Sequence, residues 1–260
     1  MGLYDLPACF DYITNITGVE KLNYIGHSMG TMQMFAALTL RPDYFESKLT
    51  SFVALAPVTE LYNLKSLRLR YLLDRSVVGK VASYVHEAFT VPAITGNIIT
   101  VLCKYLMPIC SNLFRVFSDI DISDLSFEEK ERFFDYISRL PSSTSSKSFQ
   151  HFEMIYQSKS FIHYDYGVNN MKIYGQSTPL EYKMENIKNI KICLLIGEID
   201  KLAPIESVRE LQKSLELKND VYFHEYKNMG HHCFFFSNNF EWFKDVVNFL
   251  DKITHNKPII

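Results

Sequence analysis

The chain has 260 residues, of which 47% are hydrophobic, and its formal net charge is −2. This length fits one domain with a sizeable core, or one domain with a large insertion. The weak net charge and the lack of a basic block argue against a nucleic-acid partner. The five cysteines contain no C-x-x-C pair, which argues against a zinc or redox motif. Cys103 and Cys110 could pair in an oxidising compartment, which the sequence leaves open.

Neither a signal peptide nor a membrane-spanning segment is expected. Residues 1–5 lack the basic and apolar regions of a signal peptide. Residues 89–114 are apolar, but Pro92, Lys104 and Pro108 interrupt them before an uncharged run of about 18 residues is reached. We therefore predict a helical hairpin in this segment that is buried or faces lipid.

The first 57 residues alternate between helical and strand patterns. An amphipathic helix is expected over residues 5–17, a strand over 21–25, a helix over 29–40 and a buried strand over 51–56. Pro57 ends this strand. The strand–helix–strand order predicts a parallel sheet.

The pattern changes between residues 58 and 188. Apolar segments predict helices over 61–73, 76–90, 96–118 and 126–139, the last opened by a capping box at Ser126 and Glu129. A serine-rich loop is expected from Pro141 to Ser148. We predict that residues 58–188 form a helical cap inserted into a core of residues 1–57 and 189–260.

The alternation returns near the C-terminus. Strands are expected over residues 191–196 and 221–226, helices over 205–217 and 240–253, and a loop over 228–232.

Residues 26–30 read Gly-His-Ser-Met-Gly, which is the G-x-S-x-G pattern between a predicted strand and a predicted helix. In this context the serine lies on a sharp turn that exposes its hydroxyl group, so Ser28 is the candidate nucleophile. Gly26 and Gly30 are expected because side chains there would collide with neighbouring backbone. The backbone N–H of Met29, at the start of the helix, is a candidate oxyanion donor.

A serine nucleophile needs an imidazole base, and the imidazole needs an acid that orients it. In this architecture the order along the chain is serine, acid, histidine, each after a strand. Asp200 and His231 fit this order and placement, with Glu198 and His232 as the respective alternatives. The other histidines fit structural or surface roles: His27 as a packing residue, His224 within a strand and His255 in the tail.

The sequence resembles the acid lipase family of gastric and lysosomal lipases. The matching segments span nearly the whole chain in family order: residues 4–8 (YDLPA), 26–31 (GHSMGT), 54–58 (ALAPV), 149–152 (FQHF), 164–167 (YDYG), 169–170 (NN), 174–179 (YGQSTP), Asp200 and 230–231 (GH). The resemblance implies an α/β-hydrolase fold with a helical cap, and a Ser28–Asp200–His231 triad. It also implies hydrolysis of acylglycerols or steryl esters at a lipid–water interface without metal or cofactor, in a secreted or lysosomal location.

Three departures from the family pattern bear on these expectations. Met29 stands where the family has glutamine, and His232-Cys233 stands where it has Leu-Asp. Only 25 residues precede the G-x-S-x-G pattern, whereas the family has a longer segment carrying the first strands and an H-G loop with the second oxyanion donor. We therefore expect an incomplete sheet with an apolar edge at residues 21–25, and impaired activity of the chain as written.

Three functions are weighed. The first is a serine hydrolase acting on neutral lipid esters. The second is a truncated homologue that binds lipid or a partner without turnover, which the short N-terminal segment favours. The third is a thioesterase or small-ester esterase, against which the large apolar insertion argues.

Overall fold

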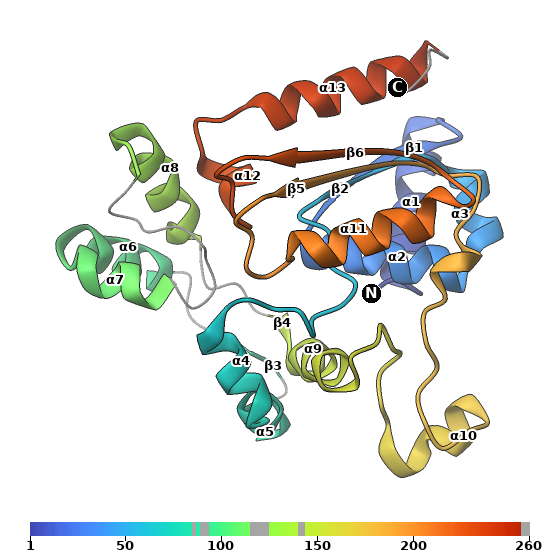
Figure 1. Cartoon of the computed structure of the whole chain (residues 1–260), viewed down its shortest axis with the longest axis horizontal. Helices are drawn as coiled ribbons and strands as arrows, with labels where there is room; N and C mark the ends of the chain where they lie inside the picture. The colour runs from blue at the N-terminus through green and yellow to red at the C-terminus, as the bar shows by residue number, and fades with distance from the viewer. Residues whose placement is uncertain (85–86, 89–93, 115–124, 140–143, 256–260) are drawn as a thin grey trace. The chain divides into compact units, whose positions relative to one another are not determined.

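The computed structural model describes residues 1–84, 87–88, 94–114, 125–139 and 144–255. The chain divides into two units. The first unit comprises residues 1–59, 181–231 and 239–260, and the second comprises residues 60–180 and 232–238. Figure 1 labels the elements of both units, which are described separately below.

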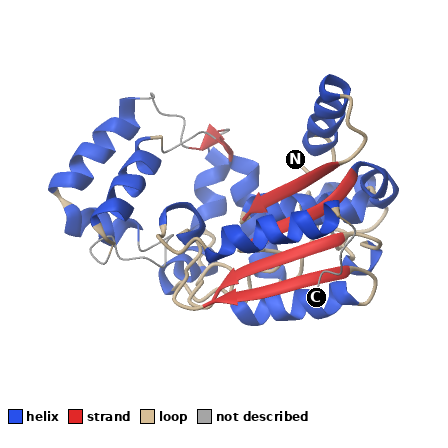
Figure 2. Cartoon of the chain, turned by 90° about the horizontal axis from the view of Figure 1, so that it is seen from above, coloured by secondary structure: helices blue, strands red, loops and turns tan. Residues whose placement is uncertain are grey.

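The first unit is built on a parallel sheet. Its strands are β1 (Leu22–His27), β2 (Leu49–Leu55), β5 (Lys191–Gly197) and β6 (Asp220–Tyr226), in the spatial order β1-β2-β5-β6. All three pairings are parallel, so the carboxyl ends of the strands lie along one edge of the sheet, which Figure 2 shows from above. In such sheets, ligands bind outside the carboxyl ends of the strands.

Helices cover both faces of this sheet. In Figure 1, α13 (Glu241–Thr254) lies on one side of the strands, and α2 (Met29–Leu40) and α11 (Ile205–Glu216) lie on the other. Residues Phe52–Leu55 of β2 and Ile192–Gly197 of β5 are therefore buried. Near-continuous apolar strands of this kind are typical of parallel sheets that are covered on both faces.

The strand before Ser28 lies at an edge of the sheet. Within the described part of the chain, β1 pairs with β2 alone. Leu22 and Tyr24 are partly exposed, and Ile25 is 51% exposed. The expected apolar edge at residues 21–25 is thus present in this structure.

The helices predicted for the first unit are confirmed with small shifts at their ends. They are α1 (Asp5–Thr17), α2, α11 and α13. One short helix, α3 (Pro42–Lys48), was not predicted; it begins two residues after α2 ends at Leu40. Proline is favoured at the first position of a helix, where its missing N–H costs nothing, so Pro42 begins α3.

The second unit is mainly helical, as predicted. Its elements are α4 (Leu67–Asp74), α5 (Val77–Tyr84), β3 (Glu87–Ala88), α6 (Ile94–Tyr105), α7 (Met107–Phe114), α8 (Phe127–Ser138), β4 (Thr144–Ser145), α9 (Ser146–Ser158), η2 (Gly167–Asn169), α10 (Asn170–Tyr174) and α12 (Cys233–Phe236). The predicted capping box of α8 is confirmed, because Ser126 and Glu129 each accept a hydrogen bond from the other's backbone N–H.

Several predicted boundaries in this unit are wrong. The helix expected from residue 61 begins at Leu67, and the loop expected to reach Ser148 ends earlier, because α9 begins at Ser146. The single helix expected over 96–118 is interrupted between Tyr105 and Met107. Parts of the segments expected over 76–90, 96–118 and 141–148 lie outside the described residues.

The α6–α7 hairpin is held by a disulfide bond between Cys103 and Cys110. These two cysteines are buried with Phe133, Phe134 and Ile137 of α8, so one side of the hairpin belongs to a small core. The pairing that the sequence left open is therefore formed. Among the described residues, no helix is both long and apolar enough to cross a membrane.

Candidate active site

Ser28 lies in the sharp turn between β1 and α2. Its backbone has φ 52° and ψ −116°, a conformation that non-glycine residues rarely adopt and that costs about 1–3 kcal/mol. Backbone hydrogen bonds hold it there. The Ser28 N–H donates to the Leu55 carbonyl oxygen over 3.0 Å, and the Ser28 carbonyl oxygen accepts from the Thr31 N–H, the Thr31 hydroxyl and the Met32 N–H. The turn expected from the G-x-S-x-G pattern is present.

The two glycines of the G-x-S-x-G pattern differ in whether a larger side chain could replace them. A Cβ atom at Gly26 would lie 2.9 Å from the carbonyl carbon of Gly30 and 2.8 Å from the Tyr24 ring, so only glycine fits there. A Cβ atom at Gly30 would meet only the Tyr24 hydroxyl oxygen, at an ordinary contact distance of 3.6 Å. The expected collision is confirmed for Gly26 and is wrong for Gly30.

His231 lies in the loop that follows β6, and its ring bonds to both other candidate residues. Its Nε2 atom is 2.7 Å from Ser28 Oγ, and its Nδ1 atom is 2.8 Å from Asp200 Oδ2. Because a carboxylate can only accept, Nδ1 carries the proton. In the neutral ring Nε2 then accepts the hydrogen bond from the Ser28 hydroxyl, which is the arrangement that a general base requires.

Asp200 follows β5 and is held by the loop in which it lies. Its Oδ1 atom accepts hydrogen bonds from the backbone N–H groups of Leu202 and Ala203, over 2.8 Å and 2.7 Å. The residue is 1% exposed, as is His231. With one carboxylate oxygen fixed by the backbone, the other remains directed at the imidazole.

The structure brings Ser28, Asp200 and His231 together. The alternative acid, Glu198, and the alternative base, His232, do not take part in this hydrogen-bonded series. Glu198 is exposed, whereas Asp200 is buried. It is the ring of His231, and not that of the adjacent histidine, that makes both hydrogen bonds. His224 and His255 are partly exposed and lie near Asp245 and Asp251 respectively, as expected for residues outside the site.

His27, predicted to be a packing residue, also makes a polar contact with the main chain of the site. Its ring centroid is 4.9 Å from that of His231, and its Nε2 atom is 2.7 Å from the His231 carbonyl oxygen. Since a carbonyl oxygen can only accept, His27 Nε2 is the donor. Burial lowers the pKa of His27 to about 4, with a further contribution from the neighbouring His231.

The sequence analysis missed the role of Gly197, the last residue of β5. A Cβ atom there would overlap the carbonyl oxygen of Met229, two residues before His231. The Ile199 N–H donates to that same oxygen over 3.1 Å. A glycine at the carboxyl end of a buried strand is the signal that pointed to such a close approach.

The donor set in the described residues suits covalent acyl chemistry better than metal chemistry. Among the described residues, no group of three or more His, Cys, Asp or Glu side chains lies close enough together to hold a metal ion. A serine hydroxyl that is hydrogen-bonded to an imidazole, which is in turn hydrogen-bonded to a carboxylate, is the arrangement used by enzymes that transfer acyl groups through a serine nucleophile.

The chain is similar to known lipases in sequence. Residues 1–95 match the α/β hydrolase fold family. The chain is 30% identical to human gastric triacylglycerol lipase over 97% of its own length and 63% of the relative, and 28% identical to mouse lipase member N over 90% and 58%. It thus spans less than two thirds of the length of these relatives.

Among solved structures, a soluble variant of the monoglyceride lipase of Saccharomyces cerevisiae is similar, with a TM-score of 0.53 and 14% identity. The match covers 96% of this chain and 68% of the yeast protein, and at this identity it bears on the fold alone. The chain therefore has the α/β-hydrolase fold and is similar in sequence to gastric triacylglycerol lipase and lipase member N.

Proposed function

We propose that this chain carries the catalytic centre of a serine ester hydrolase, with Ser28 as nucleophile, His231 as general base and acid, and Asp200 as the residue that orients His231. The continuous hydrogen-bonded series from Ser28 Oγ through the His231 ring to Asp200 is the observation that supports it. The strained backbone of Ser28 is a second support, because that strain exposes the hydroxyl at the end of β1.

In the proposed reaction, Ser28 Oγ attacks the carbonyl carbon of the ester while His231 Nε2 takes its proton. The tetrahedral intermediate collapses when the C–O bond to the alcohol breaks, and His231 returns the proton to the leaving alkoxide. Water, deprotonated by His231, then attacks the carbonyl carbon of the acyl-serine. The bond from this carbon to Ser28 Oγ breaks, His231 returns the proton to Ser28 Oγ, and the carboxylic acid is released. Asp200 stabilises the imidazolium in both steps.

The negative oxygen of the intermediate needs hydrogen-bond donors. Met29 is the first residue of α2, where backbone N–H groups have no acceptor within the helix. We propose its N–H as one oxyanion donor, helped by the positive end of the helix dipole. The role belongs to the backbone, so the methionine side chain in place of the family's glutamine does not interfere with it.

We propose neutral lipid esters, such as acylglycerols or steryl esters, as the substrates. One matched relative is named gastric triacylglycerol lipase. The α6–α7 hairpin also presents apolar side chains, each at least half exposed: Ile98, Val101, Leu102, Tyr105 and Ile109. We call these five residues the α6–α7 stripe. Such a stripe, opposite the side that packs on α8, suits contact with a lipid surface.

We further propose that the protein works in an oxidising compartment, either outside the cell or in an endomembrane lumen. The disulfide between Cys103 and Cys110 supports this location, because such bonds are rare in reducing compartments.

The same geometry favours turnover over lipid binding alone. A lipid-binding protein has no need of a buried Asp200–His231 pair or of a strained serine within hydrogen-bond distance of the imidazole. Such features cost stability and are typical of catalytic sites.

Labelling with a fluorophosphonate, which reacts with activated serines, tests the proposal. The chain should be labelled at Ser28, and Ser28→Ala should abolish the labelling. Ser47→Ala, which removes an exposed hydroxyl outside the site, is the matched control and should label normally. Persistent labelling of the Ser28→Ala variant would reject the assignment of the nucleophile.

A further inference from the structure

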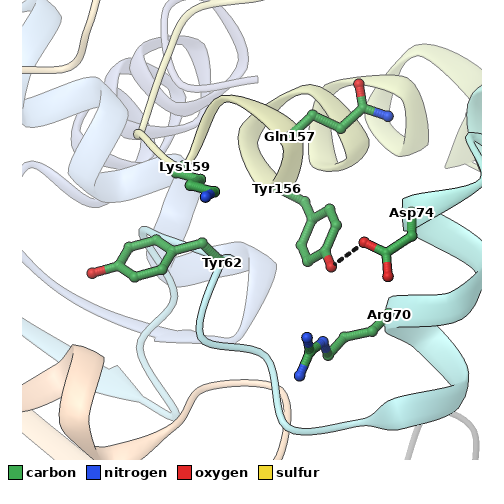
Figure 3. A pocket seen from close by; sticks show the side chains of 6 residues that line it. All are labelled: Tyr62, Arg70, Asp74, Tyr156, Gln157 and Lys159. Atoms are coloured by element: carbon green, nitrogen blue, oxygen red, sulfur yellow. Dashed lines mark hydrogen bonds between the residues drawn. The ribbon is translucent and has the colours of Figure 1, made fainter.

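The second unit contains a cavity that is separate from the catalytic residues of the first. It has a volume of about 550 Å³ and is lined by Tyr62, Arg70, Asp74, Tyr156, Gln157 and Lys159. Figure 3 shows these side chains, which come from α4, α9 and the segment before α4. The volume lies in the range of small-molecule sites, which is about 300–1,000 Å³.

Two cationic side chains line this cavity. Arg70 extends from α4, and Lys159 follows the last residue of α9, so the two charges enter from different elements (Figure 3). In the described part of the chain, the Lys159 ammonium group has no carboxylate within ion-pair distance. Among the residues that the structure describes, this positive charge of the cavity therefore has no carboxylate that neutralises it.

Asp74, the one carboxylate among the residues that line the cavity, already accepts a hydrogen bond from the protein. The Tyr156 hydroxyl donates to Asp74 Oδ1 over 2.6 Å, and Arg70 lines the cavity beside this pair (Figure 3). Arg70 precedes Asp74 by four residues on α4, the spacing at which opposite charges on a helix attract. Asp74 thus offsets one of the two cations and fixes Tyr156, and a net charge of about +1 remains in the cavity.

We propose that this cavity binds the phosphate group of a small phosphorylated ligand, between Arg70 and Lys159. Guanidinium and ammonium groups both donate to phosphate oxygens, and the tetrahedral phosphate can accept from donors that approach from different sides. A planar carboxylate has two oxygens and fits this arrangement less well. The volume beyond a single phosphate leaves room for the remainder of the ligand beside the Tyr62 ring.

The phosphate could belong to a soluble molecule or to a lipid headgroup, and separate measurements distinguish them. Binding of sn-glycerol 3-phosphate is followed by ³¹P NMR, with acetate as the competing carboxylate. Sedimentation with phosphatidylcholine vesicles, with and without phosphatidic acid, tests the headgroup. Binding of either phosphate source supports the site and identifies which one it takes.

The variants are Arg70→Gln and Lys159→Gln, with Lys172→Gln on α10 as the control that removes an exposed cation of the same unit outside the cavity. Each cavity variant should weaken binding by about tenfold or more, the loss expected for one charge-assisted hydrogen bond, and the control should not. The proposal is overturned if no phosphate source binds, if acetate competes as well as phosphate, or if Lys172→Gln weakens binding equally.

Two further measurements distinguish a loss of phosphate binding from misfolding and from a loss of the proposed esterase activity. Thermal unfolding shows whether each variant is folded, and Lys159→Gln, which changes an exposed side chain with no ion pair in the described residues, is the safer of the two. Hydrolysis of a soluble short-chain ester should be unchanged in both cavity variants. The cavity proposal therefore stands or falls independently of the proposed esterase activity.

Discussion

His27 Nε2 donates a hydrogen bond to the backbone carbonyl oxygen of His231, so the residue before the proposed nucleophile restrains the main chain of the proposed base. His27→Leu removes this donor and should lower kcat by about 10- to 100-fold with little change in KM, because the imidazole loses its alignment. His27→Gln keeps an N–H donor near the same position and should retain most of the activity. Equal loss in both variants would mean that the imidazole of His27 itself is required.

His27 should also make the stability of the protein depend on pH. Burial lowers its pKa from 6.5 to about 4 in the folded state. Between these values the unfolded chain binds a proton that the folded chain does not. The free energy of unfolding should therefore fall by up to about 3 kcal/mol as the pH decreases from 6.5 to 4, while above this range the contribution is constant. Urea unfolding of the wild type and of His27→Gln at both ends of the range measures it, and an equal fall in both proteins would exclude His27 as the cause.

The two glycines of the G-x-S-x-G pattern should respond differently to alanine. Gly26→Ala forces a Cβ atom against the backbone of Gly30 and should destabilise the fold by about 1–3 kcal/mol and reduce labelling of Ser28. Gly30→Ala places a methyl group at normal contact distance within α2, where alanine favours the helix, so stability should be unchanged or slightly higher. Urea unfolding and fluorophosphonate labelling give both comparisons, and equal damage in the two variants would contradict this interpretation.

His231→Ala should lower kcat/KM for a soluble ester by about 10⁴-fold, as expected when one member of a catalytic triad is lost. His232→Ala should have a much smaller effect, since it is the His231 ring that contacts both Ser28 and Asp200. Steady-state hydrolysis of a short-chain ester by the two variants decides between the two histidines. A larger loss in His232→Ala would move the general base by one residue.

The α6–α7 stripe should matter for dispersed lipid and not for soluble esters. Val101→Ser removes an exposed apolar side chain from the stripe, and Val247→Ser removes one of similar exposure from α13 in the first unit. If the stripe contacts the lipid surface, Val101→Ser should weaken adsorption to emulsified triacylglycerol by up to about tenfold. Val247→Ser should adsorb normally, and hydrolysis of a soluble ester should be unaffected in both. Equal adsorption of the two variants would argue against this contact.

Local sequence patterns predicted the elements around the site well. The strands β1, β2, β5 and β6 have apolar runs bounded by turn residues, and α1, α11 and α13 have apolar side chains at helical spacing. Because parallel strands end at a common edge, the positions of Ser28, Asp200 and His231 after three of these strands were sufficient to predict that their side chains meet.

Contacts between residues far apart in the sequence could not be predicted in this way. The hydrogen bond between His27 and His231 joins residues 204 positions apart, and the approach of Gly197 to Met229 joins the end of β5 to the loop after β6. Local signals also misled at Ser146, where a serine-rich segment indicated a loop although a helix begins there. Serine favours both turns and helix starts, so tertiary packing decides between them.

The peptide group that joins His231 to His232 is one of the places where the polypeptide passes from the first unit to the second. The carbonyl oxygen of that peptide group is the atom that His27 holds. The hydrogen bond from His27 therefore restrains the main chain at a boundary between the two units. The residue proposed to carry the proton is fixed on both sides, by Asp200 at its ring and by His27 at its carbonyl group.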